Sequence, residues 1–402
     1  MVCFMEDVRK GERAAALAAL VCGGLAFAYP AYLVLMFHSH DWILTANGHP
    51  AITDFLVFWL AGRSALQGAA AAAYDPHFLH AAEAAAAGHA FAGHLPWRYA
   101  PHFLFVVSAL ALLPYMLAFL VWVAGSLAAY AAVISRIART RIALVLACAT
   151  PAVFINAICG QNGPLTAALI GAALLTLEEQ PVAAGIFLAL LSYKPQFGIL
   201  FPLVLVAGGY WRALLSAVLA TAGVVLASAL VFGTRSLWAF VHFLPITSNE
   251  LLIHGVNGFA KLQTAYGAVR WLGYDNAVAW MAQAAVVLAI SAGLVWLWRR
   301  DLPFSLKAAA LCVGTLLATP HLYAYDFAVL IVAFAFLYRA RIFDTVELGG
   351  IALANLCVGA FLFFPSPIGL VALAVSTALV ARRCVEQLRQ PARALAAALS
   401  PA

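Results

Sequence analysis

One carboxylate and one guanidinium stand out in an otherwise apolar stretch, ITDFLVFWLAGRSALQG, at residues 52–68. Asp54 lies near its start and Arg63 follows nine residues later. A carboxylate at the edge of an apolar environment can accept the proton of a sugar hydroxyl and so act as a general base. Arg63 can bind a phosphate, or it can lay its apolar stem along the segment and keep its charge in water. A structural role is also open, because Thr53 or Asp54 could cap a helix that begins here.

Two other polar positions have the chemistry to bind an anion. Lys194 lies in the turn SYKPQ and is one of four lysines in the chain. It could bind a lipid phosphate at head-group depth, or extend from a helix end toward water. His321 lies in TPHLYAYD and could donate to a phosphate or to a departing oxygen. That segment could instead be an aromatic belt with a helix N-cap. Together with Arg63, these two side chains form the predicted binding site for a donor phosphate.

Aromatic faces and side-chain amides suit the recognition of a sugar ring, although such residues also occur in any exposed loop. The predicted substrate-binding residues of this kind are Trp59, Tyr99, Gln161, Asn162, Gln196, Tyr323 and Asn257.

Other kinds of site have less support in the sequence. His77, His80 and Glu83 follow one another at helical spacing, so a metal site is conceivable. The spacing is loose and no HExxH motif occurs, so we interpret this part as a solvated loop and predict no metal and no cofactor. The seven cysteines are scattered and form no CxxC pair, which is typical of small core residues. GxGxxG, P-loop and GxSxG motifs are absent, which leaves nucleotide chemistry and serine hydrolysis unsupported.

The composition indicates which solvent surrounds these residues. The 402-residue chain is 65% hydrophobic and 9% charged, with a mean hydropathy of +0.97, whereas soluble domains carry about 25% charged residues. A core of this size cannot hide so much apolar surface, so the chain is predicted to be an all-α polytopic membrane protein forming one transmembrane domain over residues 1–402. The net charge of +6 comes from cations between the apolar runs, without the basic stripe that nucleic-acid binding requires.

About twelve apolar runs are long enough, or nearly so, to cross a membrane. The first is too long for a typical cleaved signal peptide and is predicted to be an uncleaved span, with a cleaved signal as the alternative. The runs cover residues 14–37, 115–135, 142–158, 163–178, 181–193, 195–209, 211–232, 277–298, 303–319, 324–338, 346–363 and 367–381.

The positions of the cations predict the orientation. If each run crosses once, the basic segments all fall on the side of the N-terminus, which the positive-inside rule identifies as the cytoplasm. Both termini are then cytoplasmic. The run 99–114 would place the cations at 136–141 outside if it crossed, so we predict an interfacial or re-entrant helix there. The basic segments lie at residues 9–13, 136–141, 211–212, 299–300, 339–341 and 382–393.

Most of the remaining polar residues fall on the opposite side. That side receives a first external loop at 38–114, with interfacial helices, and a second large external loop at 233–276, together with the turns at 159–163, 192–196 and 319–326. The sequence therefore predicts an integral protein of the plasma (inner) membrane with a single active site on its outer face.

The motifs DFLVFWLAGRSALQG, YDP, WRYAP, GQNGPL, YKPQFGILFPL, WRALL and TPHLYAYDFAVL occur in this order from Asp54 to Phe327. In this the chain resembles the polyprenyl-phosphate-dependent membrane glycosyltransferases of family 87, which are GT-C enzymes related to α-mannosyltransferases and arabinofuranosyltransferases. The resemblance implies a GT-C-like bundle, a polyprenyl-phosphate sugar donor, an external glycan or glycolipid acceptor, and Asp54 as the catalytic aspartate. It also implies that no metal is needed. The DxD pair of some other GT-C enzymes is absent.

The function expected from this resemblance is transfer of a mannose-like or pentose sugar with inversion, in contact with membrane lipids. The alternative from another class is a secondary transporter or flippase. Transporters place polar residues near the membrane midplane, often in paired repeats. Here the ionisable residues collect at one end and no repeat is evident. A lipid scaffold without catalysis is a third interpretation.

Overall fold

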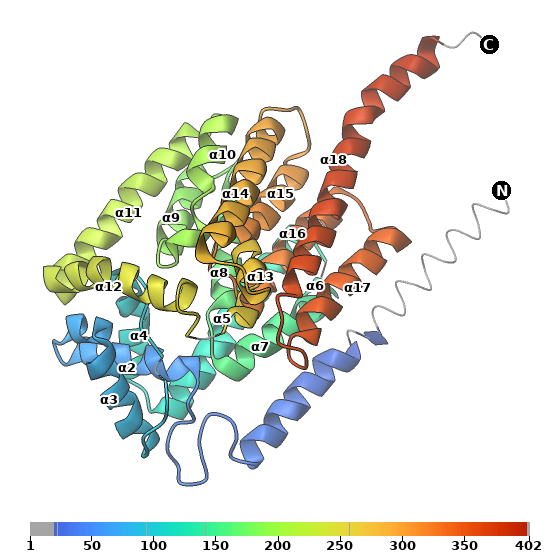
Figure 1. Ribbon diagram of the computed structural model, residues 1–402. Helices are drawn as coiled ribbons and strands as arrows, with labels where there is room; N and C mark the ends of the chain where they lie inside the picture. Colours follow the sequence, from blue (N-terminus) through green and yellow to red (C-terminus); the bar gives the residue numbers. More distant parts are fainter. Residues whose placement is uncertain (1–19, 22, 94, 141, 257, 400–402) are drawn as a thin grey trace.

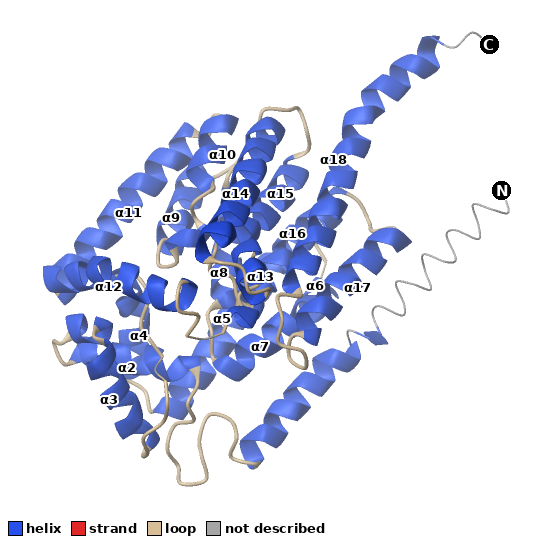
Figure 2. Ribbon diagram, viewed as in Figure 1, coloured by secondary structure: helices blue, strands red, loops and turns tan. Residues whose placement is uncertain are grey.

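The computed structural model describes residues 20–399 apart from 22, 94, 141 and 257. This part of the chain consists of helices and loops, and it contains no strand beyond isolated bridges that join Trp42, Leu44 and Pro50 (Figure 2). The prediction of an all-α protein is confirmed for the described residues.

The α-helices follow one another closely after a first helix, Gly23–His38. Short 3-10 turns precede several of them. In chain order the labelled elements are α2 (Asp54–Leu66), η1 (Ala70–Tyr74), α3 (Pro76–Ala87), η2 (Pro101–Phe103), α4 (Leu104–Ala111), α5 (Tyr115–Ala138), α6 (Ile142–Cys148), α7 (Pro151–Cys159), α8 (Gly163–Thr176), α9 (Pro181–Leu191), η3 (Pro195–Phe197), α10 (Phe201–Gly208), α11 (Trp211–Phe232), α12 (Thr234–Leu252), η4 (Phe259–Lys261), α13 (Ala265–Trp271), α14 (Asn276–Trp298), α15 (Phe304–Ala318), η5 (Ala324–Phe327), α16 (Ala328–Ala340), α17 (Thr345–Ala360) and α18 (Gly369–Leu399).

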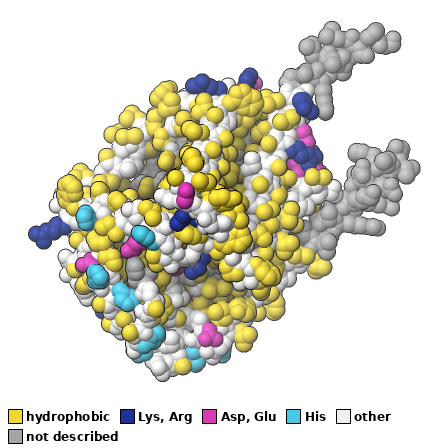
Figure 3. Space-filling model, in the orientation of Figure 1, with side chains coloured by type: hydrophobic (Ala, Val, Ile, Leu, Met, Phe, Trp, Pro, Cys, Tyr) yellow, Lys and Arg dark blue, Asp and Glu magenta, His cyan; other side chains and the backbone are white. Residues whose placement is uncertain are grey.

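Three of the described helices are long and apolar enough to cross a membrane by themselves: α5, α11 and α14. At 1.5 Å per residue, 22 to 24 residues extend about 33–36 Å, slightly more than the hydrocarbon thickness. Only Ala213 and Ser228 of α11 are buried, and apolar side chains such as Leu226 and Leu230 are exposed. Apolar atoms cover much of the visible surface (Figure 3). Such a surface is stable only in lipid, so this is an integral membrane protein.

Several predicted spans are interrupted. The run 142–158 is divided into α6 and α7, because Pro151 begins a new helix at its first position. The run 195–209 starts with η3 before α10, and the run 324–338 starts with η5 before α16. The last predicted span, 367–381, was too short, since α18 continues to Leu399. These shorter helices leave the number of crossings a prediction.

The predicted interfacial segment at 99–114 contains η2 and α4. The eight residues of α4 extend about 12 Å, which is too short to cross a bilayer. A close approach of α2 to α4 depends on Gly62, since a Cβ there would meet the Val107 backbone and lie 2.8 Å from the Ala111 side chain. Helices α2, α3 and α4 lie together at the lower left of Figure 1. They are the helices predicted for the first external loop.

The core lies around α8, α15 and α16. Most side chains of α8 are buried, and its Gly171 allows the neighbouring α5 to approach, because a Cβ there would lie 2.6 Å from a Val133 methyl group. Small residues at such contacts let helices pack closely in a membrane. Helix α7 ends and α8 begins at the turn 159–163, and α9 ends just before the turn 192–196.

Basic residues occupy the connection between α16 and α17 and the facing part of α18. Arg383 is buried and binds Glu347 with two guanidinium nitrogens, while Arg382 binds Asp344 at 2.7 Å. The connections α14–α15 and α16–α17 lie at the upper and right-hand edges of Figure 1, away from α2–α4 at the lower left. The predicted inner and outer segments therefore lie at different ends of the bundle, while their membrane sides stay a prediction.

Candidate active site

Two helix-connecting turns meet at a buried asparagine. The Asn156 side-chain oxygen accepts a hydrogen bond from the Gly163 amide at 2.8 Å, and its amide nitrogen donates to the Tyr325 carbonyl at 2.7 Å. Gly163 has no room for a side chain, since a Cβ would meet the Tyr325 carbonyl oxygen and would lie 2.7 Å from the Asn156 amide. The turns at 159–163 and 319–327 are thereby held against each other.

Asp54 is the first residue of α2, and this end of the helix lies against one of the two turns. The beginning of α2 packs on the turn at Gly160, where a Cβ would lie 2.5 Å from that of Phe55. Thr53 occupies the N-cap position but makes no capping hydrogen bond, its hydroxyl lying 3.3 Å from that of Tyr115. Neither residue therefore caps the helix with its side chain. Asp54 as a whole residue is half-buried.

The Gln161 side chain is oriented toward Asp54. Its carbonyl oxygen accepts from the Tyr99 hydroxyl at 3.3 Å and from the Asn162 backbone amide at 3.2 Å. That leaves the amide nitrogen as the donor for the Asp54 carboxylate, with which Gln161 is hydrogen-bonded.

Three cations act on the Asp54 carboxylate through their charge. Burial raises the pKa of Asp54 above its usual 3.8, while the Gln161 hydrogen bond and the charges of Arg98, Lys261 and Lys194 act in the opposite direction. The net result is a raised pKa. A carboxylate of this kind is a stronger base than one in water.

Lys194 is not a free cation. Its ammonium lies 2.9 Å from a carboxylate oxygen of Asp326, and both side chains are almost fully buried. The other Asp326 oxygen accepts from the Tyr323 amide at 3.1 Å. The alternative that Lys194 extends from a helix end toward water is wrong, since its side chain points into the protein.

Arg98 and Lys261 were missed as site residues. Neither side chain makes a hydrogen bond or ion pair with another residue in the described part of the chain, and the Arg98 Nε atom is buried. With Lys194 they give three positive charges against the two carboxylates of Asp54 and Asp326. Both could have been recognised as candidate site residues from the sequence, because Arg98 belongs to the motif WRYAP and Lys261 is one of the four lysines.

His321 lies near the same charges as a neutral ring. Its Nε2 atom is 3.3 Å from the Ser248 hydroxyl oxygen. Burial, together with the nearby charge of Arg98, lowers the pKa of His321 to about 4. At pH 7 the imidazole can therefore donate one hydrogen bond but carries no positive charge.

Residues 97–320 match the profile of glycosyltransferase family 87, which is more than half of the chain. The chain belongs to glycosyltransferase family 87. The predicted resemblance is thus confirmed, and a GT-C type is consistent with the family. No curated protein and no solved structure matches the chain. The match begins C-terminal to Asp54 and ends at residue 320, so it covers the turns at 159–163 and 192–196 but neither the predicted base nor His321.

The other predicted substrate-binding residues of this family 87 protein differ in their burial and surroundings. Tyr99 and Asn162 are buried beside Gln161, and Tyr323 stacks on Tyr325 with ring centroids 5.4 Å apart. Gln196 is half-buried in η3. Asn257 lies outside the described residues.

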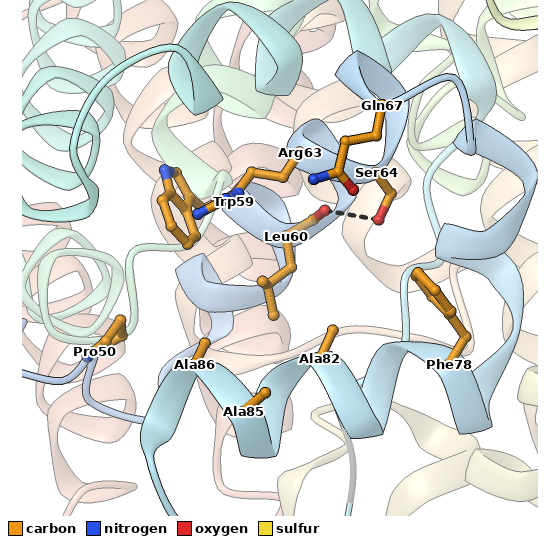
Figure 4. A pocket seen from close by; sticks show the side chains of 10 residues that line it. All are labelled: Pro50, Trp59, Leu60, Arg63, Ser64, Gln67, Phe78, Ala82, Ala85 and Ala86. Atoms are coloured by element: carbon orange, nitrogen blue, oxygen red, sulfur yellow. Dashed lines mark hydrogen bonds between the residues drawn. The ribbon is translucent and has the colours of Figure 1, made fainter.

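Trp59 and Arg63 are turned away from Asp54. The Arg63 guanidinium lies 4.7 Å from the centre of the Trp59 ring, and both side chains line a cleft between α2 and α3 (Figure 4). Nine residues of helix correspond to about 13 Å and an odd number of half-turns, which puts Arg63 on the face opposite Asp54. The structure thus does not bring Arg63 to Lys194 and His321.

The histidine-rich part of the first loop forms no metal centre among the described residues. No group of three His, Cys, Asp or Glu side chains in that part of the chain is arranged to hold a metal ion. His80 instead faces Glu83 at 3.6 Å.

Proposed function

We propose that this family 87 glycosyltransferase transfers a sugar from a polyprenyl phosphate to an acceptor hydroxyl, with Asp54 as general base. The observation that carries the proposal is that the half-buried residue Asp54 is hydrogen-bonded by Gln161 and stabilised by the charges of three cations. A base must border the space that the acceptor enters, and a phosphate leaving group needs positive charge nearby.

Asp54 takes the proton of the acceptor hydroxyl, whose oxygen forms a bond to the anomeric carbon of the donor sugar. The bond between that carbon and the phosphate oxygen breaks, and the polyprenyl phosphate leaves with the electron pair. Attack and departure on opposite faces of the sugar give inversion. Proton transfer of this kind contributes about 10²–10⁴-fold to the rate.

Cations stabilise the negative charge that develops on the phosphate, and they do so more strongly in surroundings of low dielectric constant. Arg98 and Lys261 have donors to offer, since neither is paired with another described residue. Lys194 contributes from its ion pair with Asp326, and His321 contributes a neutral N–H. This assignment replaces Arg63 as a donor-phosphate residue.

The ring of the transferred sugar, a mannose-like hexose or a pentose, lies against Tyr99, Gln161, Asn162, Gln196 and Tyr323. The acceptor is a glycan or glycolipid at the outer face of the plasma membrane, with both termini in the cytoplasm. The basic connections at the far end of the bundle support this orientation through the positive-inside rule.

The experiment compares purified wild-type protein with Asp54→Asn on a labelled polyprenyl-phosphate sugar. Transfer by Asp54→Asn is expected to fall by about 10²-fold or more. Asp41→Asn, an exposed aspartate of the same loop, is the matched control and should keep wild-type activity. Equal turnover by Asp54→Asn and wild type would refute the base assignment. Movement of the labelled lipid between leaflets without loss of its sugar would favour a flippase.

A further inference from the structure

A cleft of about 390 Å³ between α2 and α3 is separate from the proposed reaction centre. One wall is the outer face of α2 and the other is α3, with Pro50 at one end (Figure 4). Its lining residues are Pro50, Trp59, Leu60, Arg63, Ser64, Gln67, Phe78, Ala82, Ala85 and Ala86.

The charge of this cleft is of one sign. Among the described residues, Arg63 is the sole charged residue that lines it, and no carboxylate does. In the described part of the chain the Arg63 guanidinium makes no hydrogen bond or ion pair; its contact is with the face of Trp59. The side-chain amide of Gln67 beside it is likewise not hydrogen-bonded to a described residue (Figure 4). These donors suit an anionic group, for which a guanidinium offers two parallel hydrogen bonds.

Apart from Ser64, whose hydroxyl donates to the Leu60 carbonyl at 3.0 Å, the remaining lining is apolar. Trp59 donates its indole N–H to the Leu113 carbonyl at 3.1 Å, which ties the cleft to the connection between α4 and α5. Leu112, next in the chain, is 72% exposed, and Leu66 at the end of α2 is 49% exposed. Such side chains are stable against lipid tails. The occupant therefore has an anionic head and an apolar part.

The reacting donor is excluded as the occupant by distance. A phosphate held by Arg63 would lie about 13 Å along α2 from Asp54 and on the opposite face of the helix. The phosphate of a donor is one bond away from the carbon that reacts. One phosphate cannot serve both places.

We propose that the cleft binds the head group and upper acyl chain of an anionic glycerophospholipid from the surrounding membrane. Arg63 and Gln67 bind the phosphate, the Trp59 ring supports the guanidinium, and Leu60 and Ala82 contact the chain. The site anchors α2, and with it Asp54, at the membrane surface. The inference does not depend on the proposed transfer reaction.

Lipid binding is measured by native mass spectrometry of the full chain in detergent, with phosphatidylglycerol and phosphatidylcholine of identical chains. We expect phosphatidylglycerol to bind more tightly. Arg63→Gln should weaken its binding about tenfold, which corresponds to ~1.4 kcal/mol, and should leave phosphatidylcholine unchanged. Arg235→Gln, which removes an exposed cation of α12, is the matched control and should bind like wild type.

A second pair of variants tests the cleft itself and not the charge. Ala82→Phe fills the apolar wall, whereas Ala81→Phe adds the same ring to an exposed position of α3 outside the cleft. Phosphatidylglycerol binding should fall with Ala82→Phe alone, and circular dichroism should show both variants folded. Equal binding by the two variants, or equal loss in Arg63→Gln and Arg235→Gln, would overturn the proposal. Displacement of phosphatidylglycerol from wild type, but not from Arg63→Gln, by a polyprenyl phosphate would reassign the cleft to that lipid and overturn it as well.

Discussion

Lys194 and Asp326 form an ion pair of 2.9 Å between residues 132 positions apart in the chain, and both side chains are almost completely buried. The pair joins the turn after α9 to the turn before α16. It lies among the charges around Asp54, to whose carboxylate Lys194 contributes. Two buried charges in this position hold the turns together and also supply part of the positive charge of the proposed phosphate site.

Breaking this pair should destabilise the protein strongly. In Asp326→Asn the Lys194 ammonium stays buried without its counter-charge, which typically costs about 3–5 kcal/mol. Thermal unfolding of the purified protein is expected to show a large drop in midpoint. Arg382→Gln removes a partly exposed ion pair with Asp344 and should cost about 1 kcal/mol or less.

The double variant Lys194→Met, Asp326→Leu separates stability from activity. Apolar side chains of similar volume often replace a buried ion pair without loss of stability. We therefore expect near-wild-type unfolding with strongly reduced transfer, because the cation is gone. Wild-type activity in this variant would show that Lys194 has no part in the reaction.

The pH profile of transfer should depend on Gln161. The base acts only when Asp54 is ionised, so activity is lost as the pH falls through the raised pKa of Asp54. Gln161→Ala removes a hydrogen bond that stabilises the carboxylate, so the pKa rises further and the acid limb of kcat/KM moves to higher pH. Gln180→Ala, at an exposed position before α9, should leave the limb in place. A limb unmoved by Gln161→Ala would argue against Asp54 as the titrating group.

Replacement of Arg98 should weaken the reaction with the lipid-linked donor without lowering the stability of the fold. Its guanidinium has no ion-pair partner among the described residues, so Arg98→Gln should change the unfolding temperature little. A hydrogen bond to a charged group is worth about 1.5–3 kcal/mol, so kcat/KM for the lipid-linked sugar should fall about tenfold or more. Arg299→Gln serves as the control, because it removes an exposed cation just after the C-terminal end of α14. Unchanged kcat/KM for Arg98→Gln would remove Arg98 from the phosphate site.

Gly163→Ala should damage the meeting point of the turns. The added methyl group would meet the Tyr325 carbonyl oxygen and the Asn156 amide, and overpacking of this kind costs about 1–3 kcal/mol. Unfolding temperature and transfer should both fall. Gly125→Ala, in α5 with no atom within 4 Å of the new Cβ, should be neutral or slightly stabilising. A fully stable Gly163→Ala would contradict the tight contact.

Part of the candidate site followed from residue type and local pattern. The motifs around Asp54, Gln161, Lys194 and His321 were recognisable from the sequence. The structure joins Asp54 to Gln161 and to the charge of Lys194, and the charge of Arg98 acts on both Asp54 and His321. Their catalytic roles stay predictions. The family was recognisable as well, because its short motifs occur in order along one chain. Arg63 was predicted to share the phosphate site, although nine residues of helix correspond to an odd number of half-turns and so point away from Asp54.

The sequence by itself determined the solvent, the helical class and the family. A chain with 65% hydrophobic and 9% charged residues must bury its backbone hydrogen bonds within helices and its surface in lipid. Such properties depend on composition and on neighbours in the chain, so they can be predicted without the fold.

Only the tertiary structure decided which charges meet. The pairing of Lys194 with Asp326, the unpaired state of Arg98 and Lys261 toward the described residues, and the neutral ring of His321 all depend on turns that are far apart in sequence. Burial and Coulomb energy vary with distance in space, and spacing along the chain does not give that distance. For this reason Lys194, expected to bind a phosphate or to extend toward water, was found with a partner, while two cations that were not predicted act on the Asp54 carboxylate through their charge.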